Sequence, residues 1–336
     1  MKILILKPSS LGDVIQALPV LRLLKQHYPQ SEIYWWIEAS LAPLIEGDPD
    51  LTGVVRFQRK RWGKPQHWPE MLQSIQWLRA QKFDLVIDLQ CLLRSALFAW
   101  LANGTRLVGL DETREGARGF YDDAARRLTF HTHAVDWYLS VLPPLGVPVH
   151  HNFVWLPQRP EVATVVDKKW PRDQARWIAL LPGARWTNKR WPATHFAELV
   201  RILAGRLPGS RFAILGGKDD SPLAETIQAA APDRCLNLCG STTLQEMIEW
   251  VRRCDLMVTN DTGPMHVAAA MGKPLVGLFG PTAPQRTGPY GQLAHIVRLD
   301  LPCSPCLKPV CRAAITEECL RHLAPETVAR KVLALC

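Results

Sequence analysis

The chain has 336 residues, 47% of them hydrophobic and 21% charged, which is the composition of a globular protein with room for two domains. Lys and Arg outnumber Asp and Glu by 40 to 31, so an anionic partner is favoured, whether nucleic acid, an acidic membrane surface or a phosphorylated substrate. The sequence has neither a signal-peptide core nor a membrane-spanning run. We therefore expect a cytoplasmic protein, in which most of the nine cysteines form no structural disulfide.

Short apolar runs alternate with helical patterns along both halves of the chain. In the first half the runs are residues 3–6, 33–37, 54–57, 85–89 and 106–109. In the second half they are residues 177–181, 211–215, 256–259, 275–279 and 295–298. The polar residues 158–175 between the halves contain Pro160 and Pro171 and suit a linker. This order is typical of parallel βαβ winding, so we predict an α/β protein with two Rossmann-like lobes facing a central cleft.

A turn between a strand and a helix at residues 259–266 is the first candidate ligand site. Asp261 or Thr262 can cap the helix, Gly263 lets a ligand approach the backbone, and Pro264 suits the first helical turn. The amides and the positive dipole end of such a helix suit a phosphate group. The alternative interpretation is a capped helix that binds no ligand. A helix cap alone, however, gives no reason for a histidine at position 266.

The loop at residues 181–192 follows the first strand of the second half. Arg185, Lys189 and Arg190 can neutralise a diphosphate, and the Thr187 hydroxyl can donate a hydrogen bond. A solvated basic loop is the alternative. The next strand ends at Gly216-Gly217-Lys218-Asp219-Asp220, which forms either a third wall of the site or a simple turn. The chain has no Walker A pattern, so ATP hydrolysis is not indicated.

Three motifs together resemble one family. Ser10-Leu11-Gly12-Asp13, Lys189-Arg190-Trp191-Pro192 and Asn260-Asp261-Thr262-Gly263-Pro264-Met265-His266 are similar, in this order, to the bacterial ADP-heptose:lipopolysaccharide heptosyltransferases of glycosyltransferase family 9. The resemblance implies a GT-B fold, with an acceptor-binding domain at residues 1–157 and an ADP-sugar donor-binding domain at residues 158–322. It also implies that a C-terminal helix, within residues 323–336, packs back on the first domain.

The resemblance also implies roles for single residues. Asp13 matches the base that takes the proton of the attacking sugar hydroxyl in an inverting transfer; alone, Ser10 and Asp13 have the spacing of a helix capping box. Lys189 is expected to stabilise the ADP leaving group. The donor-binding residues are then Thr187, Lys189, Gly216, Asp261, Thr262, Gly263 and His266. Asp48-Pro49-Asp50 matches a metal-binding Asp-x-Asp pattern, but it lies in a proline turn of the acceptor lobe, so we interpret it as a turn. This agrees with the resemblance, which implies that catalysis needs no metal cofactor.

The acceptor is expected to be anionic, and basic loops of the first half offer contacts for it. The candidates are Ser10, Arg61, Lys64 and Arg114. A solvated basic surface is the alternative. Trp137 stands where a basic residue is common in the family, which puts details of acceptor recognition in doubt. Basic loops also predict peripheral, electrostatic contact with the cytoplasmic face of the inner membrane.

Four cysteines lie close together near the C-terminus. Cys303, Cys306, Cys311 and Cys319 could hold a structural zinc or iron ion, form a disulfide, or remain unlinked thiols. Their spacing differs from the paired C-x2-C pattern of common zinc ribbons.

The function predicted from these features is transfer of L-glycero-D-manno-heptose from ADP-heptose to a Kdo or heptose of the lipopolysaccharide inner core. One alternative is a sugar-nucleotide epimerase of similar fold, which needs no acceptor. Another is a non-catalytic two-lobed nucleotide-binding protein. We do not expect a nucleic-acid partner, because the sequence has no helix-turn-helix, RNP-like or finger pattern.

Overall fold

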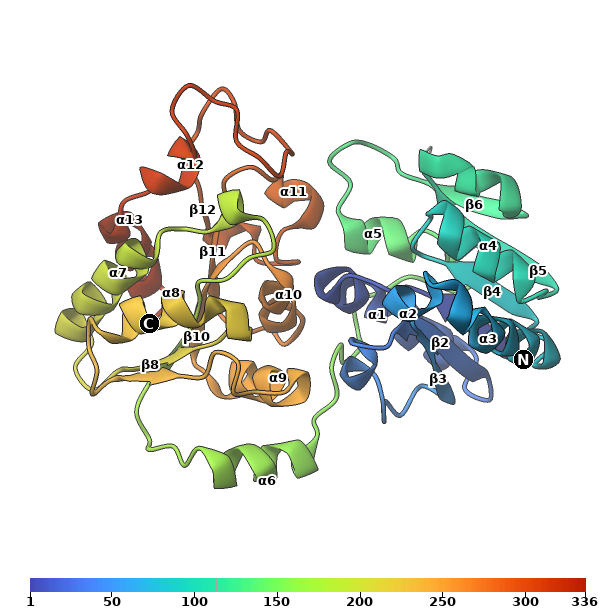
Figure 1. The fold of residues 1–336 in the computed structure, drawn as a ribbon, viewed down its shortest axis with the longest axis horizontal. Helices are drawn as coiled ribbons and strands as arrows, with labels where there is room; N and C mark the ends of the chain where they lie inside the picture. Colours follow the sequence, from blue (N-terminus) through green and yellow to red (C-terminus); the bar gives the residue numbers. More distant parts are fainter. Residues whose placement is uncertain (113) are drawn as a thin grey trace. The chain divides into compact units, whose positions relative to one another are not determined.

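The structure is a computed structural model that describes residues 1–112 and 114–336. It divides into two compact units, Met1–Pro157 and Gln158–Cys336 (Figure 1). The division falls where the polar stretch between the two series of apolar runs begins. Each unit contains one parallel sheet, so the two predicted Rossmann-like lobes are confirmed.

The first unit is built on a six-stranded sheet in the order β3-β2-β1-β4-β5-β6. All neighbouring strands pair in parallel, and β1 lies between β2 and β4. The strands are β1 (Lys2–Leu6), β2 (Glu32–Glu38), β3 (Gly53–Phe57), β4 (Leu85–Asp88), β5 (Arg106–Asp111) and β6 (Asp123–Arg126). Chain winding reverses direction at β1 and β4, and in such sheets ligands bind beyond the carboxyl ends of the strands at the reversal.

Helices connect the strands of this sheet. The α-helices are α1 (Leu11–His27), α2 (Arg59–Trp62), α3 (Trp68–Ala80), α4 (Leu93–Leu101) and α5 (Ala134–Leu139). Short 3-10 turns are η1 (Ala42–Leu44), η2 (Pro65–His67), η3 (Arg114–Phe120) and η4 (Pro143–Leu145). Trp36 of β2 stacks on Phe57 of β3, and Phe98 of α4 packs on both rings. This aromatic cluster fixes α4 on the sheet.

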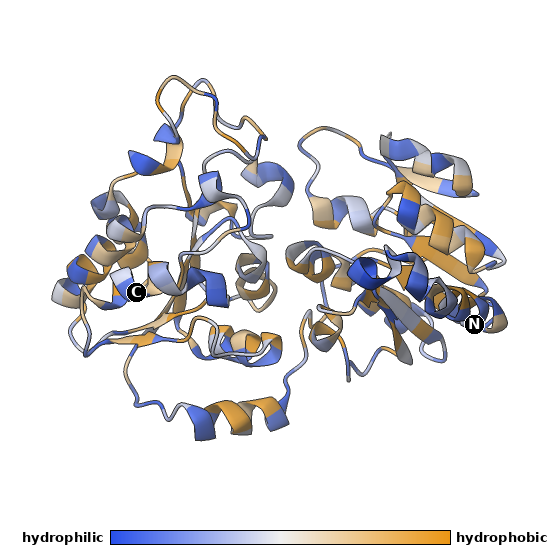
Figure 2. Ribbon diagram, in the orientation of Figure 1, coloured by the Kyte–Doolittle hydropathy of each residue, from blue (hydrophilic) through white to orange (hydrophobic). Residues whose placement is uncertain are grey.

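The second unit repeats the plan with the sheet order β12-β11-β10-β7-β8-β9. Its strands are β7 (Trp177–Leu181), β8 (Arg211–Ile214), β9 (Cys235–Asn237), β10 (Leu256–Asn260), β11 (Leu275–Leu278) and β12 (Ile296–Val297). Its α-helices are α6 (Pro160–Lys169), α7 (Ala193–Arg206), α8 (Ser221–Gln228), α9 (Leu244–Arg253), α10 (Gly263–Ala270), α11 (Pro284–Thr287), α12 (Glu318–Arg321) and α13 (Pro325–Leu333). Its 3-10 turns are η5 (Thr187–Lys189), η6 (Lys218–Asp220) and η7 (Leu293–His295). The strands are largely hydrophobic (Figure 2), as expected for a sheet covered on both faces.

The reversal of winding in the second sheet lies between β7 and β10. These strands pair in parallel, with Leu181 opposite Thr259. The loop that follows β7 and the turn that follows β10 therefore leave the sheet side by side. This juxtaposition is what positions the candidate donor site.

The fold corrects one expectation. The stretch at residues 158–175 is not only a linker, because it contains helix α6, which buries Val162 and Val166 and packs on α9. At the C-terminus, α13 packs on α7, and its Val328 and Val332 belong to the apolar core of the second unit. The packing of this helix on the first domain stays a prediction. Both helices have apolar residues at i and i+4 that need a partner nearby.

No helix in the part of the chain that the structure describes is long and apolar enough to cross a bilayer.

Candidate active site

A pocket of about 470 Å³ lies at the point where the winding of the second sheet reverses. The loop after β7, the end of β8 and the start of α10 all line it. The lining residues are Leu181, Gly183, Ala184, Arg185, Arg190, Leu215, Gly216, Gly217, Lys218, Asp219, Asp220, Thr242, Thr243, Leu244, Met247, Thr262 and Pro264. Of the predicted donor residues, Gly216 and Thr262 line this pocket directly, and three basic side chains accompany them.

Buried Asn260 connects the loop after β7 to the end of β10. Its Oδ1 accepts a hydrogen bond from the Trp191 amide at 3.0 Å, and its Nδ2 donates to the Pro182 carbonyl at 2.7 Å. Asn260 is fully buried, so both contacts are protected from water. The two loops that build the pocket are therefore held together by one side chain.

Lys189 and Asp261 form an ion pair beside the pocket. Lys189 Nζ lies 2.7 Å from Asp261 Oδ2, and the Thr282 hydroxyl donates to the same oxygen at 2.6 Å. Lys189 Nζ also lies 4.8 Å from the centroid of the Trp186 ring. The side chains of Lys189 and Asp261 are 18% and 7% exposed, so the pair is largely shielded while the lysine still reaches solvent. Thr282 was not predicted from the sequence, because it follows a different strand, β11.

The turn after β10 begins helix α10 as predicted, but the capping differs from the expectation. Thr262 is the N-cap residue and its side chain makes no capping hydrogen bond, while Asp261 binds Lys189 instead. The helix starts at Gly263, and Pro264 occupies the first turn. His266 is buried within α10. The start of α10 therefore leaves the Thr262 hydroxyl on the pocket wall, beside helix amides that have no partner within the helix.

Two glycines of the pocket leave room for the Asp220 carboxylate. A Cβ atom on Gly183 would lie 2.3 Å from Asp220 Oδ2, and one on Gly216 would lie 2.9 Å from the same oxygen. Asp220 Oδ2 also accepts a hydrogen bond from the Gly217 amide at 3.0 Å. Any larger residue at position 183 would displace this carboxylate. Asp220 belongs to the stretch after β8 that the sequence offered as a third wall of the site, and all five residues of that stretch line the pocket. Its close approach to the two glycines could not be predicted from the sequence.

Thr187 is the first residue of η5, and two residues that follow it are anchored. Asn188 is buried and its Nδ2 donates to the Lys308 carbonyl at 2.8 Å. The Arg190 guanidinium donates to the Ala184 carbonyl at 2.9 Å. The loop that carries Thr187 and Lys189 is therefore held in the middle of η5 and directly after it.

In the first unit, Asp13 lies in the first turn of α1. Its Oδ2 accepts hydrogen bonds from the Ser10 amide at 2.9 Å and from the Ser10 hydroxyl at 2.7 Å. These contacts form the capping box that the spacing predicts, and they fix the orientation of the carboxylate. Ser10 is thereby engaged with Asp13.

Lys7 is a buried cation near Asp13. Its Nζ donates to the Leu89 carbonyl at 2.9 Å and lies 4.6 Å from the centroid of the Tyr138 ring. Burial alone would lower the pKa of Lys7, but the nearby Tyr138 and Asp13 side chains raise it above the ordinary lysine value. Lys7 therefore stays charged beside Asp13.

A smaller pocket, of about 170 Å³, lies beyond the carboxyl ends of β1 to β4. It is lined by Pro8, Ser9, Trp36, Glu38, Phe57, Arg59, Gln90, Leu92, Arg94, Ser95 and Glu115. Asp88 supports its floor, because it accepts hydrogen bonds from the Gln90 amide and the Ser95 hydroxyl at 2.8 Å each. Burial raises the pKa of Asp88, and these hydrogen bonds only partly offset that rise.

Arg61 and Lys64, two of the predicted acceptor cations, do not line this pocket. Arg61 forms an ion pair with Glu70 on the surface, with 2.5 Å between Nη2 and Oε1. Lys64 is exposed at the start of η2. The side chain of Arg114 lies outside the described part of the structure, as does Thr113. Arg59 and Arg94 line the pocket instead.

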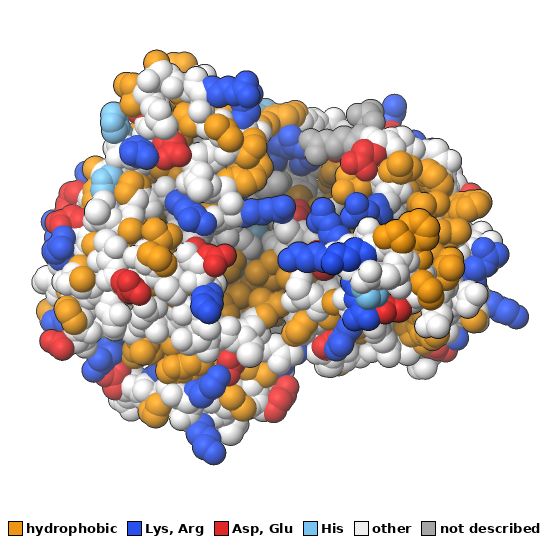
Figure 3. Space-filling model, in the orientation of Figure 1, with side chains coloured by type: hydrophobic (Ala, Val, Ile, Leu, Met, Phe, Trp, Pro, Cys, Tyr) orange, Lys and Arg blue, Asp and Glu red, His pale blue; other side chains and the backbone are white. Residues whose placement is uncertain are grey.

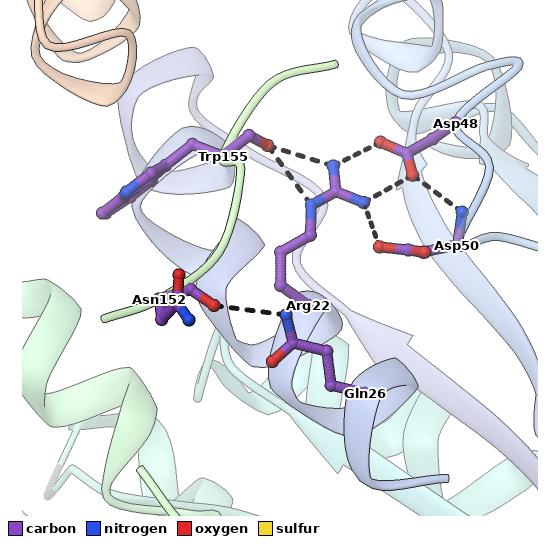
Figure 4. A network of polar contacts seen from close by, with 6 residues as sticks. All are labelled: Arg22, Gln26, Asp48, Asp50, Asn152 and Trp155. Carbon is purple, nitrogen blue, oxygen red and sulfur yellow. Dashed lines mark hydrogen bonds and ion pairs between the residues drawn. The ribbon is translucent and has the colours of Figure 1, made fainter. Parts of the chain in front are cut away.

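The Asp-x-Asp pattern has a structural role. Asp48 and Asp50 both bind the guanidinium of buried Arg22, with oxygens 2.6 Å from Nη1 in each case, and Arg22 also donates to the Trp155 carbonyl (Figure 4). The main-chain carbonyl of Asn152 accepts a further bond from Gln26 in the same network. The two carboxylates are thus neutralised by an arginine and stabilise the fold of the first unit.

The four C-terminal cysteines line one further pocket, of about 330 Å³, together with Asn188. All nine cysteines are unlinked. Among the described residues, no three His, Cys, Asp or Glu side chains are arranged to hold a metal ion. The geometry therefore fits the alternative of unlinked thiols and gives a structural zinc or iron ion no support.

Comparisons with known proteins agree with this geometry. Residues 71–316 match the sequence profile of glycosyltransferase family 9 (heptosyltransferase). All of the chain aligns with 98% of lipopolysaccharide heptosyltransferase 1 of Pseudomonas aeruginosa, at 30% identity.

Solved structures give the same result. The E. coli ADP-heptose lps heptosyltransferase II has a TM-score of 0.80 at 25% identity, over 100% of this chain and 98% of that chain. The E. coli heptosyltransferase WaaC with ADP has a TM-score of 0.77 at 25% identity, over 100% of both chains, and it is also known with ADP-2-deoxy-2-fluoro heptose. These likenesses confirm the GT-B fold class. The chain belongs to glycosyltransferase family 9 and is a glycosyltransferase of the heptosyltransferase type.

Proposed function

We propose that this protein transfers L-glycero-D-manno-heptose from ADP-heptose to a Kdo or heptose residue of the lipopolysaccharide inner core, with inversion at the anomeric carbon. The lobe of residues 158–322 would bind the donor, and the lobe of residues 1–157 would bind the acceptor. The proposal is supported most directly by the Lys189–Asp261 ion pair beside a basic pocket at the start of α10. Relatives named as lipopolysaccharide heptosyltransferases support the sugar and the acceptor class.

Lys189 is the candidate for stabilising the leaving group. An ammonium group has three donors, so Lys189 can keep its bond to Asp261 and also donate to a phosphate oxygen. Thr282 holds Asp261 from the other side, which limits how far the lysine can move. Arg185 and Arg190 add positive charge to the same pocket. Charge that develops on the departing diphosphate would therefore meet fixed cations and the start of a helix.

Thr187, Thr262, Gly263 and Gly216 would contact the donor through hydroxyls and close backbone approach. Thr262 and Gly216 line the pocket, whereas Thr187 and Gly263 are close in sequence to residues that line it. His266 is buried in α10, where we assign it a supporting position behind the turn.

Asp13 is the candidate base. In the proposed reaction the acceptor hydroxyl oxygen forms a bond to the anomeric carbon while the bond from that carbon to the β-phosphate oxygen breaks. ADP leaves with the electron pair, and the hydroxyl proton passes to Asp13. The capping contacts from Ser10 fix the Asp13 carboxylate through Oδ2, and the buried cation of Lys7 lies nearby.

The acceptor would bind beyond the strands of the first sheet. Arg59 and Arg94 line the pocket there, and Arg61 and Lys64 extend the positive surface outward. Anionic sugar acids such as Kdo suit such a surface, because guanidinium groups pair with carboxylates in a bidentate way. Arg114 remains a proposed contact. The reaction so described requires no metal cofactor, and it would take place in the cytoplasm.

The test is incubation of the purified protein with ADP-heptose and separate core acceptors that end in Kdo or in heptose, followed by mass spectrometry. A gain of one heptose residue on one acceptor supports the proposal and identifies the acceptor sugar. An incubation with ADP-heptose alone is the matched control. Conversion of the donor to an isomer without an acceptor would support the epimerase alternative, and tight ADP binding without any product would support a binding protein.

A further inference from the structure

Helix α4 is hydrophobic on its outer face as well as on its inner face. Ala96, Phe98 and Ala99 pack into the core of the first unit. On the opposite side, Leu93, Leu97 and Trp100 follow one another at helical spacing and are 46%, 40% and 56% exposed. A helix at a protein surface normally has a polar outer face. Among the described residues, the ring of Phe120 lies at the edge of this apolar face, 6.4 Å from the ring of Trp100, but the three side chains stay largely exposed.

Neighbouring helix α3 extends this apolar surface. The two helices are in contact, and α3 exposes Trp68 and Leu72, which are one helical turn apart. We define the docking face as Trp68, Leu72, Leu93, Leu97 and Trp100. Figure 3 shows hydrophobic side chains gathered over these helices of the first unit, with Lys and Arg side chains nearby.

The surroundings of the docking face are cationic. Residues 59–101, which include α2, α3 and α4, contain seven Lys and Arg but three acidic residues. Asp88 is fully buried and Glu70 is paired with Arg61. Exposed Asp84 and Glu115, which accepts a hydrogen bond from the Leu93 amide, are acidic groups that remain there, and the cations outnumber them. The exposed cations include Arg59, Lys60, Lys64 and Arg94.

We propose that the docking face inserts into the interfacial layer of an anionic lipid bilayer. Trp and Leu side chains with a cationic border are the pattern of helices that lie in the plane of a membrane surface. Arg94, between Leu93 and Leu97 in sequence, can extend to a lipid phosphate while its neighbours enter the acyl region. This mode of binding adds apolar insertion to electrostatic attraction.

The charge of the border favours a bilayer over a second copy of the chain. A two-fold dimer through the docking face would use the same surface on both subunits. Its cationic borders would then face each other, whereas anionic lipids complement them. The apolar residues alone would suit either partner.

The experiment is flotation of the full-length protein with vesicles of phosphatidylethanolamine and phosphatidylglycerol, and with vesicles of phosphatidylcholine. Wild-type protein should float with the anionic vesicles. The variant Leu97→Gln/Trp100→Gln should partition at least roughly tenfold less, because two inserted side chains become polar. The variant Lys60→Gln/Lys64→Gln should lose the electrostatic contribution to vesicle binding, which is also the contribution that added salt removes.

Matched controls separate insertion from general loss of apolar surface and from misfolding. Leu293→Gln removes an equally exposed leucine from the second unit and should float like the wild type. Leu93→Ser is a milder variant that should float with the anionic vesicles less than the wild type does. Its circular dichroism spectrum in the near ultraviolet should be unchanged, which would show that it is folded.

Three results would overturn the proposal: no flotation of the wild type, wild-type flotation of the double variant, or a dimer in solution that the double variant abolishes. The last result would identify a second copy as the partner. The vesicles contain no lipopolysaccharide and no ADP-heptose, so the outcome does not depend on the proposed transfer reaction.

Discussion

Replacement of Lys189 by Met should weaken ADP binding and also destabilise the second unit. The change removes the ammonium that lies 2.7 Å from Asp261 Oδ2 and leaves a carboxylate whose side chain is 7% exposed. Loss of one partner of a buried pair costs about 3–5 kcal/mol, and we expect about 3 kcal/mol because water still reaches the lysine. Loss of a charge-assisted hydrogen bond to phosphate costs about 1.5–3 kcal/mol, so Kd for ADP should rise about 10- to 100-fold.

A second variant separates these two effects. Lys189→Met/Asp261→Asn removes the unpaired charge while the Asn side chain can still accept the hydrogen bond from Thr282. Urea unfolding should show that this double variant regains most of the lost free energy of unfolding. Calorimetric titration should show that its affinity for ADP stays low. If Lys189→Met binds ADP as tightly as the wild type, or if the double variant recovers full affinity, Lys189 does not bind the diphosphate.

Further predictions concern catalysis, packing, pH and metals. Asp13→Asn should lower the transfer rate about 10²- to 10⁴-fold with unchanged ADP affinity, measured by mass spectrometry and calorimetry; a rate near that of the wild type would remove Asp13 from the mechanism. Gly183→Ala should weaken ADP binding and cost about 1–3 kcal/mol of unfolding free energy, because its Cβ would lie 2.3 Å from Asp220 Oδ2. Gly205→Ala is the control, since open space surrounds that position, and it should be neutral or slightly stabilising. Burial alone would raise the pKa of Glu246, but hydrogen bonds from a lysine and from the capping box lower it overall. Its charged form therefore stabilises the fold above the ordinary pKa of 4.5, and this contribution disappears as the pH falls through the lowered value in the folded state. Glu246→Gln should consequently destabilise the protein at pH 7, and urea unfolding at a series of lower pH values should show this effect shrinking progressively below pH 4.5. Transfer activity should survive exhaustive chelation, and an absolute need for added magnesium would contradict the metal-free reaction.

The central strands were predictable because they are continuous apolar runs buried on both faces. The predicted run at residues 177–181 coincides with β7, and most other runs differ from their strands by one or two residues. Two strands were missed. β6 (Asp123–Arg126) is polar and lies at an edge of its sheet, and β9 has three residues. Edge strands need no apolar residues on both faces, so they lack the pattern that identifies the inner ones.

The site was predictable in its parts rather than in its contacts. Lys189 and Asp261 both follow from motifs, but their ion pair joins positions 72 residues apart, and only the pairing of β7 with β10 brings them together. Thr282 carries no motif of its own, so its role emerges only from the packing of neighbouring loops. Asp220 was offered as part of a third wall, but its contacts with Gly183 and Gly216 depend on the packing of two loops. Arg22 illustrates the same limit, because its position within α1 gives no sign that it neutralises Asp48 and Asp50.

The most direct test of the central claim is a time course of heptose transfer from ADP-heptose to purified core acceptors, followed by mass spectrometry for the wild type, Asp13→Asn and Lys189→Met. We predict that one acceptor gains a single heptose residue with the wild type, that both variants form this product far more slowly, and that only Lys189→Met needs more donor to reach half of its maximal rate. Absence of product with every core acceptor, or equal rates for all three proteins, would contradict the proposed function and its mechanism.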